Sequence, residues 1–498
     1  MNVNPITRLD YPDPDVIRVE DTYYMVSTTM HFMPGCEILQ SFDLVHWEHA
    51  TYVYETLDHT DAQQLKSGQN IYGQGMWAAS LRYHEGRFYI CFVANDTRKT
   101  YLYTSEKIDG PWKKQLIEGF YHDGSLLFDE DGRNYIVYGN DEIWITELNE
   151  DLTAPKKDGL HRLLVSDHKN PELGYEGSHI QKINGYYYIF LIHSQRDRWM
   201  RTEACFYSDS LEGEFTGGDV LCDDRGYCGQ GVAQGGIVDT PDGKWYAMLF
   251  QDSGAVGRIP ILVPVTWKDH FPVFGQNGHV PEEIEVHSTR PGYIYQPLVG
   301  SDDFCNGLLP RWQFNHDPDP RYYHLDALQG TYTITTREVC TELTQAVNTL
   351  TQRMSYPSCA AEVTVDASAL KEGDVAGLCA LQSCYAAVGI TKHHGKYEVL
   401  MLDKKEDGIL DMTEGTVVES HQMDFRLEAD FCNMKDEARC YYRVNKGDWL
   451  PIGTVHKLYF KLDHFTGCRF GLFCYAAEKT GGSACFRDFK YYDVDEIS

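Results

Sequence analysis

The chain has 498 residues and a formal net charge of −30, from 44 Lys and Arg against 74 Asp and Glu. This acidity argues against nucleic acid and anionic membrane surfaces as partners, because both would repel it. Hydrophobic residues make up 42% of the chain and aromatic residues 13%, among them 34 Tyr. Such a composition indicates a globular protein of two or three domains, and the Tyr content favours β-strands.

The cysteines and the N-terminus bear on the cellular compartment. The 15 Cys are an odd number and contain no Cys-x-x-Cys pair. Residues 1–5 show neither the basic nor the apolar region of a signal peptide. No apolar run approaches the roughly 18 residues that span a bilayer. We therefore expect a cytoplasmic protein with reduced thiols.

One hairpin signal recurs five times in the first part of the chain. The clearest copy is Asn184-Gly185, between an alternating run that begins at Glu176 and an aromatic run. An Asn-Gly pair in this setting predicts a two-residue turn. A turn followed by Tyr occurs at 21–24, 86–89, 132–135, 185–188 and 243–246. Five such hairpins predict a five-bladed β-propeller over residues 1–295, since a β-sandwich seldom repeats one turn chemistry.

In each copy, one residue opens the first strand of the hairpin. It lies nine residues before the turn glycine, or eight before Asp21 in the first copy, and the five are Asp13, Trp77, Asp123, Glu176 and Gln234. The innermost strands of a propeller all start at one end of the central channel, so these side chains should meet there. Asp is also an ordinary turn residue. Three carboxylates in phase with the repeat nevertheless favour a functional site.

The character of the sequence changes near residue 290. Residues 289–301 contain Pro-Gly and Gly-Ser turns and predict a linker. Short strands separated by turns follow, without the repeated turn and Tyr. We predict an antiparallel jelly-roll β-sandwich over residues 302–498. The expected fold is therefore all-β, a five-bladed propeller followed by a sandwich.

Carboxylates that face each other across a sugar are the minimum equipment for glycoside hydrolysis. One must be protonated to donate to the leaving oxygen, and the other must be ionised to activate water or attack directly. A third carboxylate beside the acid raises the pKa of that acid by like-charge repulsion. Asp13 and Glu176 belong to blades that are not neighbours, which favours a wide separation. A gap of roughly 6.5–9.5 Å leaves room for water and predicts inversion of configuration.

Several motifs together resemble glycoside hydrolase family 43 over about residues 1–295. The part after residue 302 resembles the concanavalin-like sandwich often attached to β-xylosidases of that family. The motifs that carry the resemblance are Asn4-Pro5-Ile6, Tyr11-Pro12-Asp13-Pro14-Asp15, Trp77-Ala78-Ala79-Ser80-Leu81, His122-Asp123-Gly124-Ser125-Leu126, Glu176-Gly177-Ser178-His179, Gly257-Arg258 and, in the second part, residues 346–353 and 376–378.

The resemblance implies a role for each of the three carboxylates. Asp13 would be the general base that activates water, and Glu176 would be the general acid. Asp123 would raise the pKa of Glu176 and hold its orientation. No cofactor would be required.

The resemblance also implies which residues bind the substrate. Arg258 would hydrogen-bond hydroxyls of the terminal sugar and steady Asp123 or its neighbour. Trp77 would form an apolar wall, and Phe32 a second one. Many family members have His where this chain has Gln234, and that His often orders a central water or calcium ion. Because Gln is a poorer metal ligand, Gln234 puts a structural calcium ion in the channel in doubt.

The favoured function is an exo-acting β-xylosidase or α-L-arabinofuranosidase that removes terminal xylose or arabinofuranose from short plant-type oligosaccharides. A non-catalytic carbohydrate-binding propeller is the first alternative, although binding propellers repeat the same residues in every blade. A retaining transferase on a related five-bladed fold is the second. The expected partner is a small oligosaccharide, and the sequence leaves open whether the chain forms homo-oligomers.

Overall fold

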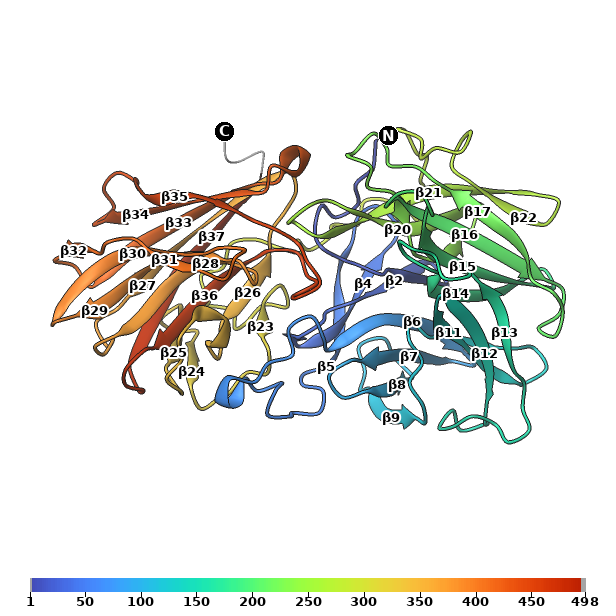
Figure 1. Cartoon of the computed structure of the whole chain (residues 1–498), viewed down its shortest axis with the longest axis horizontal. Helices are drawn as coiled ribbons and strands as arrows, with labels where there is room; N and C mark the ends of the chain where they lie inside the picture. Colours follow the sequence, from blue (N-terminus) through green and yellow to red (C-terminus); the bar gives the residue numbers. More distant parts are fainter. Residues whose placement is uncertain (1, 494–498) are drawn as a thin grey trace.

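The computed structural model describes residues 2–493, whose helices and strands are almost all β-strands. Two domains lie side by side, the N-terminal one in blue to green and the C-terminal one in yellow to red (Figure 1). Within residues 2–493, no helix has the length and apolar character needed to cross a membrane. The predicted architecture, a five-bladed propeller followed by a β-sandwich, is confirmed.

Each blade of the propeller is one antiparallel sheet, and the inner strand of the fifth blade is split in two by a loop that contains Gln234. From the innermost strand outward, blade I is β1 (Asp15–Val19), β2 (Thr22–Ser27), β4 (Gly35–Ser41) and β5 (Glu48–Tyr54); blade II is β6 (Met76–His84), β7 (Arg87–Ala94), β8 (Lys99–Ser105) and β9 (Lys113–Ile117); blade III is β10 (Ser125–Phe128), β11 (Asn134–Asn140), β12 (Glu142–Leu148) and β13 (His161–Ser166); blade IV is β14 (Glu176–Ile183), β15 (Tyr186–Ser194), β16 (Arg201–Ser208) and β17 (Thr216–Leu221); and blade V is β18 (Val232–Ala233) with β19 (Ile237–Asp239), β20 (Trp245–Asp252), β21 (Arg258–Lys268) and β22 (Phe271–Phe274).

The turn chemistry read from the sequence accounts for the hairpin that opens blade IV. Ile183 of β14 pairs with Tyr186 of β15, so Asn184 and Gly185 form a two-residue loop. Their φ angles are 51° and 85°. A type I′ turn needs positive φ at both central residues, which Asn and Gly tolerate best. The predicted hairpin is therefore confirmed.

The C-terminal domain packs two antiparallel sheets face to face (Figure 1). One sheet contains β23 (Gln313–Asn315), β26 (Leu350–Arg353), β36 (Arg469–Ala476), β28 (Asp374–Leu381), β29 (Ala386–His393), β30 (Lys396–Lys404), β31 (Leu410–Met412) and β32 (Thr416–Val418). The other contains β24 (Tyr323–Asp326), β25 (Thr331–Thr335), β37 (Ser483–Asp493), β27 (Ser358–Asp366), β33 (Gln422–Asp430), β34 (Glu437–Val444) and β35 (Leu450–Lys457). Three short 3-10 helices complete the described elements: η1 (Lys66–Gly68), η2 (Leu343–Gln345) and η3 (Cys432–Met434).

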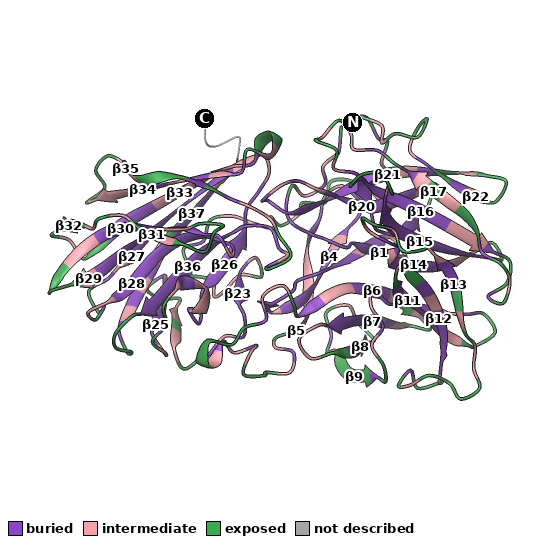
Figure 2. Ribbon diagram, in the orientation of Figure 1, coloured by how far each residue is buried: buried purple, intermediate pink, exposed green. Residues whose placement is uncertain are grey.

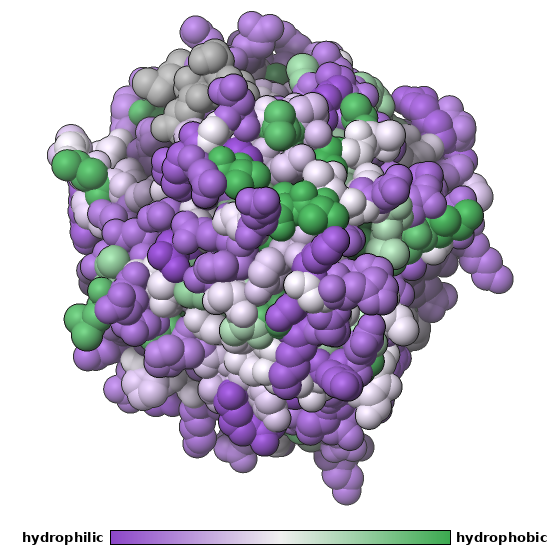
Figure 3. All heavy atoms as spheres, turned by 90° about the vertical axis from the view of Figure 1, so that its left-hand side faces the viewer, coloured by the Kyte–Doolittle hydropathy of each residue, from purple (hydrophilic) through white to green (hydrophobic). Residues whose placement is uncertain are grey.

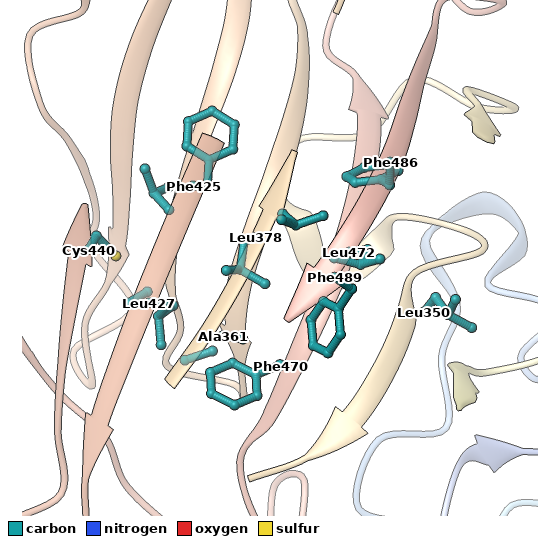
Figure 4. Packing of buried hydrophobic residues seen from close by; sticks show 14 of the residues in the cluster. Leu350, Ala361, Leu378, Phe425, Leu427, Cys440, Phe470, Leu472, Phe486 and Phe489 are labelled. Carbon is teal, nitrogen blue, oxygen red and sulfur yellow. The ribbon is translucent and has the colours of Figure 1, made fainter. Parts of the chain in front are cut away.

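The core of the sandwich lies between its two sheets. Leu378 and Leu472 come from one sheet, Phe425 and Phe486 from the other, and all four side chains are fully buried (Figure 4). Most buried residues lie on the strands of both domains, and exposed residues are commonest in the connecting loops (Figure 2). Seen from its sandwich end, the surface is mainly hydrophilic, with hydrophobic side chains in small groups (Figure 3). The sandwich thus has a hydrophobic core between its two sheets.

The two domains share a sheet. Strand β3 (Phe32–Met33) lies in the loop between β2 and β4 of blade I, but it pairs with β23 of the sandwich. Beside it, Glu37 and Arg353 form a buried ion pair across the interface at 2.8 Å. Main-chain pairing and a buried charge pair fix the sandwich against the propeller. The sequence of the predicted linker, residues 289–301, does not indicate that a strand of the propeller pairs with the sandwich.

Candidate active site

The five positions in phase with the repeat all line one pocket of about 710 Å³ at the mouth of the channel. They are Asp13, Trp77, Asp123, Glu176 and Gln234, and Arg258 lines the same pocket. The expectation that equivalent positions of the five blades converge is therefore met by the geometry. What each residue does there stays a prediction.

Two local backbone devices aim these side chains. Asp13, Asp123 and Gln234 have φ angles of 53°, 47° and 62°, in the left-handed region that few residues other than Gly adopt. Each of the three stands in the loop at an inner strand of its blade. Strain of this kind persists where the surrounding structure holds it and is common at functional sites.

In blades II and IV a β-bulge takes the place of the left-handed residue. The register of β14 shifts between Glu176 and His179, and that of β6 shifts between Met76 and Ala79. A bulge turns the side chains beside it, here Glu176 and Trp77, away from the regular alternation. Gly177 has a φ of 62°, and a Cβ at this residue would meet the Gln234 side chain at 2.7 Å. A larger residue at this position would therefore have to displace the Gln234 side chain of the neighbouring blade.

On the Asp13 side of the pocket, each carboxylate oxygen has a hydrogen-bond partner. Oδ2 accepts a hydrogen bond from Thr28 Oγ1 at 2.6 Å, and Oδ1 accepts one from Arg258 Nη1 at 3.0 Å. Asp13 is 6% exposed and Arg258 2%. Within residues 2–493, Arg258 pairs with Asp13 rather than with Asp123. A buried charge paired in this way holds the carboxylate in one orientation.

On the Glu176 side, acidic groups crowd together. Oε2 of Glu176 accepts a hydrogen bond from Asn140 Nδ2 at 2.8 Å, and Oδ2 of Asp123 accepts one from the Gly177 amide at 3.0 Å. His122 lies between the two carboxylates, with Nε2 at 3.5 Å from each. One ring nitrogen of His122 and one carboxylate oxygen each of Asp123 and Glu176 all lie within 4.8 Å of one another.

The electrostatics of the Glu176 side follow from this crowding. Burial raises the pKa of Asp123, His122 opposes the rise, and the charges of Glu176 and Asp13 add to it, giving about 6. Burial alone would lower the pKa of His122, but Asp123 and Glu176 raise it to about 9. At neutral pH His122 is therefore a cation among carboxylates.

The sandwich supplies one wall of the pocket. Residues 457–462 and Phe465, in the chain from β35 towards β36, line it. The Phe465 ring lies with its centroid 5.5 Å from that of Trp77 and 4.1 Å from the guanidinium carbon of Arg258. The Phe465 carbonyl also accepts a hydrogen bond from Arg258 Nη2 at 3.3 Å. An aromatic box of this kind suits the apolar face of a sugar ring.

Phe32 does not line this pocket. It lies in β3 at the domain interface, 2% exposed, with the Arg469 guanidinium carbon 3.4 Å from its ring centroid. The loop that carries Phe32 is drawn into the sandwich sheet by pairing with β23, so it cannot reach the channel mouth. The second aromatic wall, assigned to Phe32 from the sequence, is instead formed by Phe465.

Three pocket residues escaped the sequence reasoning. His122 stands directly before Asp123 in the sequence, but only Asp123 is in phase with the repeat. Asn140 ends the second strand of blade III, and the repeat does not extend to that position. Phe465 belongs to the other domain, and no periodicity within the propeller could find it.

Arg82 fills the axis of the propeller. Its guanidinium donates to the Asp15 carboxylate at 2.8 Å, to Ser125 Oγ at 2.7 Å and to the carbonyls of Leu126 and Ile180. These partners belong to blades I, III and IV, so a side chain from blade II that reaches all of them lies on the axis. Burial alone would raise the pKa of Asp15, but Arg82, with a contribution from His179, holds it below its ordinary value.

These axial residues do not fit a calcium ion. Calcium takes six to eight oxygen ligands. Here the side chain that gathers the oxygens on the axis is itself a fixed cation, Arg82, which would repel a second one. Gln234, in place of the expected His, lines the pocket and has its side chain packed over Gly177.

Comparisons with known proteins agree with this geometry. Residues 3–272 match glycosyl hydrolases family 43, and residues 301–492 match the beta xylosidase C-terminal concanavalin A-like domain. A beta-xylosidase of Formosa agariphila is 26% identical, over 99% of this chain and 89% of that protein. A non-reducing end alpha-L-arabinofuranosidase of Bacteroides ovatus is 24% identical, over 82% and 79%.

One solved structure is more similar in sequence. A bifunctional GH43-CE protein of Bacteroides eggerthii is 42% identical, with a TM-score of 0.92. The match covers 99% of this chain, which spans only 63% of that longer chain. The family matches account for both domains, and the pocket lies where the matched domains meet. The chain belongs to family 43 of the glycosyl hydrolases.

Proposed function

We propose that the protein is an inverting exo-glycosidase that removes terminal xylose or arabinofuranose residues from short plant-type oligosaccharides. The observation that carries this proposal is the placement of Asp13 and Glu176, from blades I and IV, in the wall of one pocket. Hydrolysis of glycosidic bonds is the chemistry of the family. Inversion, exo action and the choice of sugar are the parts that need a test.

Asp13 suits the role of general base. It is held by Thr28 and by the cation Arg258, so it presents an oriented carboxylate to the pocket. A water molecule between this carboxylate and the sugar would lose a proton to Asp13 as its oxygen attacks the anomeric carbon. Arg258 would donate a further hydrogen bond from its guanidinium to a hydroxyl of the same sugar, because its side chain lines the pocket.

Glu176 suits the role of general acid. Its side chain is 19% exposed, compared with 6% for Asp123 and 8% for Asp13, so it is the carboxyl best able to touch the leaving group. The protonated Glu176 would give its proton to the glycosidic oxygen as the bond to the anomeric carbon breaks. Asn140 holds the Oε2 atom of Glu176 in place during this step. After one turnover, the proton that Asp13 gained returns through solvent to Glu176.

The shape of the pocket supports removal of terminal residues. The sandwich segment that includes Phe460 and Phe465 forms one wall, which leaves less room for a sugar chain to continue past the pocket. Two relatives act on the proposed sugars by their names, a beta-xylosidase and a non-reducing end alpha-L-arabinofuranosidase. Xylose and arabinofuranose present similar hydroxyl patterns, so one pocket can accept both. No metal ion has a part in the proposed steps.

Replacement of the acid tests catalysis directly. Glu176→Gln should lower kcat/KM on xylobiose by about 10²–10⁴-fold, because the leaving sugar then departs without a proton. The exposed Glu150→Gln on blade III is the matched control and should retain wild-type activity. Wild-type hydrolysis by Glu176→Gln would overturn the assignment. A wild-type protein that binds xylo-oligosaccharides in calorimetry, but hydrolyses none, would favour the non-catalytic binding propeller instead.

The stereochemistry needs a separate measurement. Proton NMR of the first product released from an aryl β-xyloside should show the α-anomer, because one direct attack by water inverts the anomeric carbon. A first-formed β-anomer would contradict inversion and support the retaining transferase. A panel of five or six aryl glycosides, followed by the same NMR measurement on the best substrate, identifies the preferred sugar.

A further inference from the structure

His122 has a buried nitrogen with no conventional hydrogen-bond partner in the described part of the chain. That nitrogen, Nε2, lies 3.5 Å from Oδ2 of Asp123 and 3.5 Å from Oε2 of Glu176. One ring thus lies at equal distance from the two carboxyl groups on the Glu176 side. A small shift of either carboxylate would complete a charge-assisted hydrogen bond.

The charged groups around this ring come from three blades. Asp123 is the next residue in the chain, Glu176 lies in β14, and Asp13 precedes β1. All three carboxylates favour the protonated ring and together overcome burial, so the pKa of His122 is about 9. The cation on the far side, Arg258, is already paired with Asp13. The Trp77 ring also lies beside His122, and its centroid is 5.9 Å from that of the imidazole.

We propose that His122 is a positioning residue for the proton donor: its cationic ring bridges Asp123 and Glu176 and neutralises the charge that appears when Glu176 gives up its proton. The inference rests on the proposed function of Glu176. Before proton transfer, the buried cluster contains one full carboxylate and one imidazolium. After transfer it contains two carboxylates, and without His122 these would repel each other in a buried site. His122 itself neither gives nor takes the transferred proton.

This role opposes that of Asp123. A carboxylate beside the acid makes the acid keep its proton to higher pH, whereas a cation beside it makes the acid release the proton more readily. The two neighbours therefore set the strength of the acid between them. A stronger acid matters most for a poor leaving group, because an activated aryl group departs with little protonation.

The experiment compares three substitutions at residue 122. His122→Phe removes the charge and keeps a ring, His122→Gln keeps a hydrogen-bond donor without charge, and His122→Lys keeps a charge. For Phe and Gln we expect the alkaline limb of the kcat/KM profile to move up by about one pH unit. We also expect the ratio of activity on xylobiose to activity on a dinitrophenyl xyloside to fall about tenfold at pH 7. The Lys variant should lie nearer to the wild type in both readouts.

Controls separate this charge effect from damage to the fold. His84→Phe replaces an imidazole in β6 of blade II that stacks on Phe128 and does not line this pocket, and it should change neither readout. Thermal unfolding is followed for every variant, and if the Phe variant does not fold, the Gln variant carries the test. An unchanged pH profile in a folded Gln variant would overturn the proposal, because the hydrogen bond alone would then suffice.

A second readout does not depend on turnover. NMR titration of the imidazole in the full chain should show His122 protonated at pH 7, and its pKa should fall by more than one unit in Asp123→Asn. A ring that is neutral at pH 7 would overturn the inference even if the enzyme is active. A wild-type chain that shows this titration, but hydrolyses no glycoside, would instead refute the proposed function.

Discussion

The Asp13 side and the Glu176 side of the pocket hold their carboxylates in opposite ways. Asp13 has one cation and one hydroxyl, both at hydrogen-bond distance. On the Glu176 side, two carboxylates share one imidazole that reaches neither of them closely. The first arrangement fixes the orientation of one carboxylate. The second places two carboxylates beside one imidazole, so that the pKa of Asp123 and the pKa of His122 both depend on their neighbours.

The largest expected effects come from removing the carboxylate on each side in turn. Asp13→Asn should lower kcat/KM about 10²–10⁴-fold on every substrate, because the attack of water is needed whatever the leaving group. Glu176→Gln should be as damaging on xylobiose but should recover more than tenfold on a dinitrophenyl xyloside. Initial rates on both substrates decide the matter. The reverse pattern, recovery in Asp13→Asn, would exchange the roles of the two residues.

The next largest effect concerns Arg258, the cation that pairs with Asp13. Arg258→Lys keeps a positive charge but loses the planar guanidinium that pairs with Asp13 and contacts the Phe465 carbonyl. We expect kcat/KM to fall about 10–100-fold, mainly through KM, because sugar hydroxyls lose a donor. Lys182→Arg is the matched control, because it makes the reverse substitution at an ion pair with Asp129 on the propeller. An unchanged KM would separate Arg258 from sugar binding.

The raised pKa of Asp123 should make the stability of the folded protein depend on pH. Its pKa is about 6 in the folded protein against 3.8 in the unfolded chain, so the folded state binds more protons between these values. Stability should therefore fall as pH rises from about 4 to 6 and stay lower above that. The difference corresponds to at most about 3 kcal/mol. Asp123→Asn, which cannot ionise, should be inactive yet unfold at higher temperature at pH 7.

Calorimetric scans at pH 4 and pH 7 test the sign of this effect. The gain from Asp123→Asn should be present at pH 7 and disappear at pH 4, where Asp123 is protonated in the folded protein. A gain of equal size at both values would mean that ionisation is not its cause. If Asp123→Asn were less stable than the wild type at pH 7, this would contradict a raised pKa for Asp123 in the folded protein.

The smallest expected effect concerns metal. Because Arg82 gathers the oxygens on the axis, a strong chelator should change neither the unfolding temperature nor kcat/KM, and added calcium should restore nothing. Activity assays and thermal unfolding with and without the chelator measure this. A loss of activity that calcium reverses would mean that a cation binds despite Arg82. Arg82→Ala, in contrast, should be strongly destabilising, since it leaves Asp15 buried without its cation.

The repeat in the sequence was enough to predict the propeller and the meeting of Asp13, Asp123 and Glu176. The spacing of the repeat locates the residues at positions that recur in every blade. It fails for residues that do not recur, and so Asn140 and Phe465 were missed and Phe32 was misplaced. Phe32 lies in a short strand that pairs with a distant domain, and local patterns hold no information on such a pairing. Arg82 and His122 were visible as charges, but only the geometry shows what they neutralise.

The shared sheet at the domain interface has a consequence for biosynthesis. Strand β3 is made early in translation, yet its partner β23 is made only after all five blades. The propeller can close before the sandwich exists, but the loop around Met33 must wait with its main-chain groups unpaired. The shared sheet is thus completed only after β23 has been made, and the pocket wall at residues 457–465 follows later still. Catalytic competence should appear only when the sandwich residues of the pocket wall have been made and have folded against the propeller.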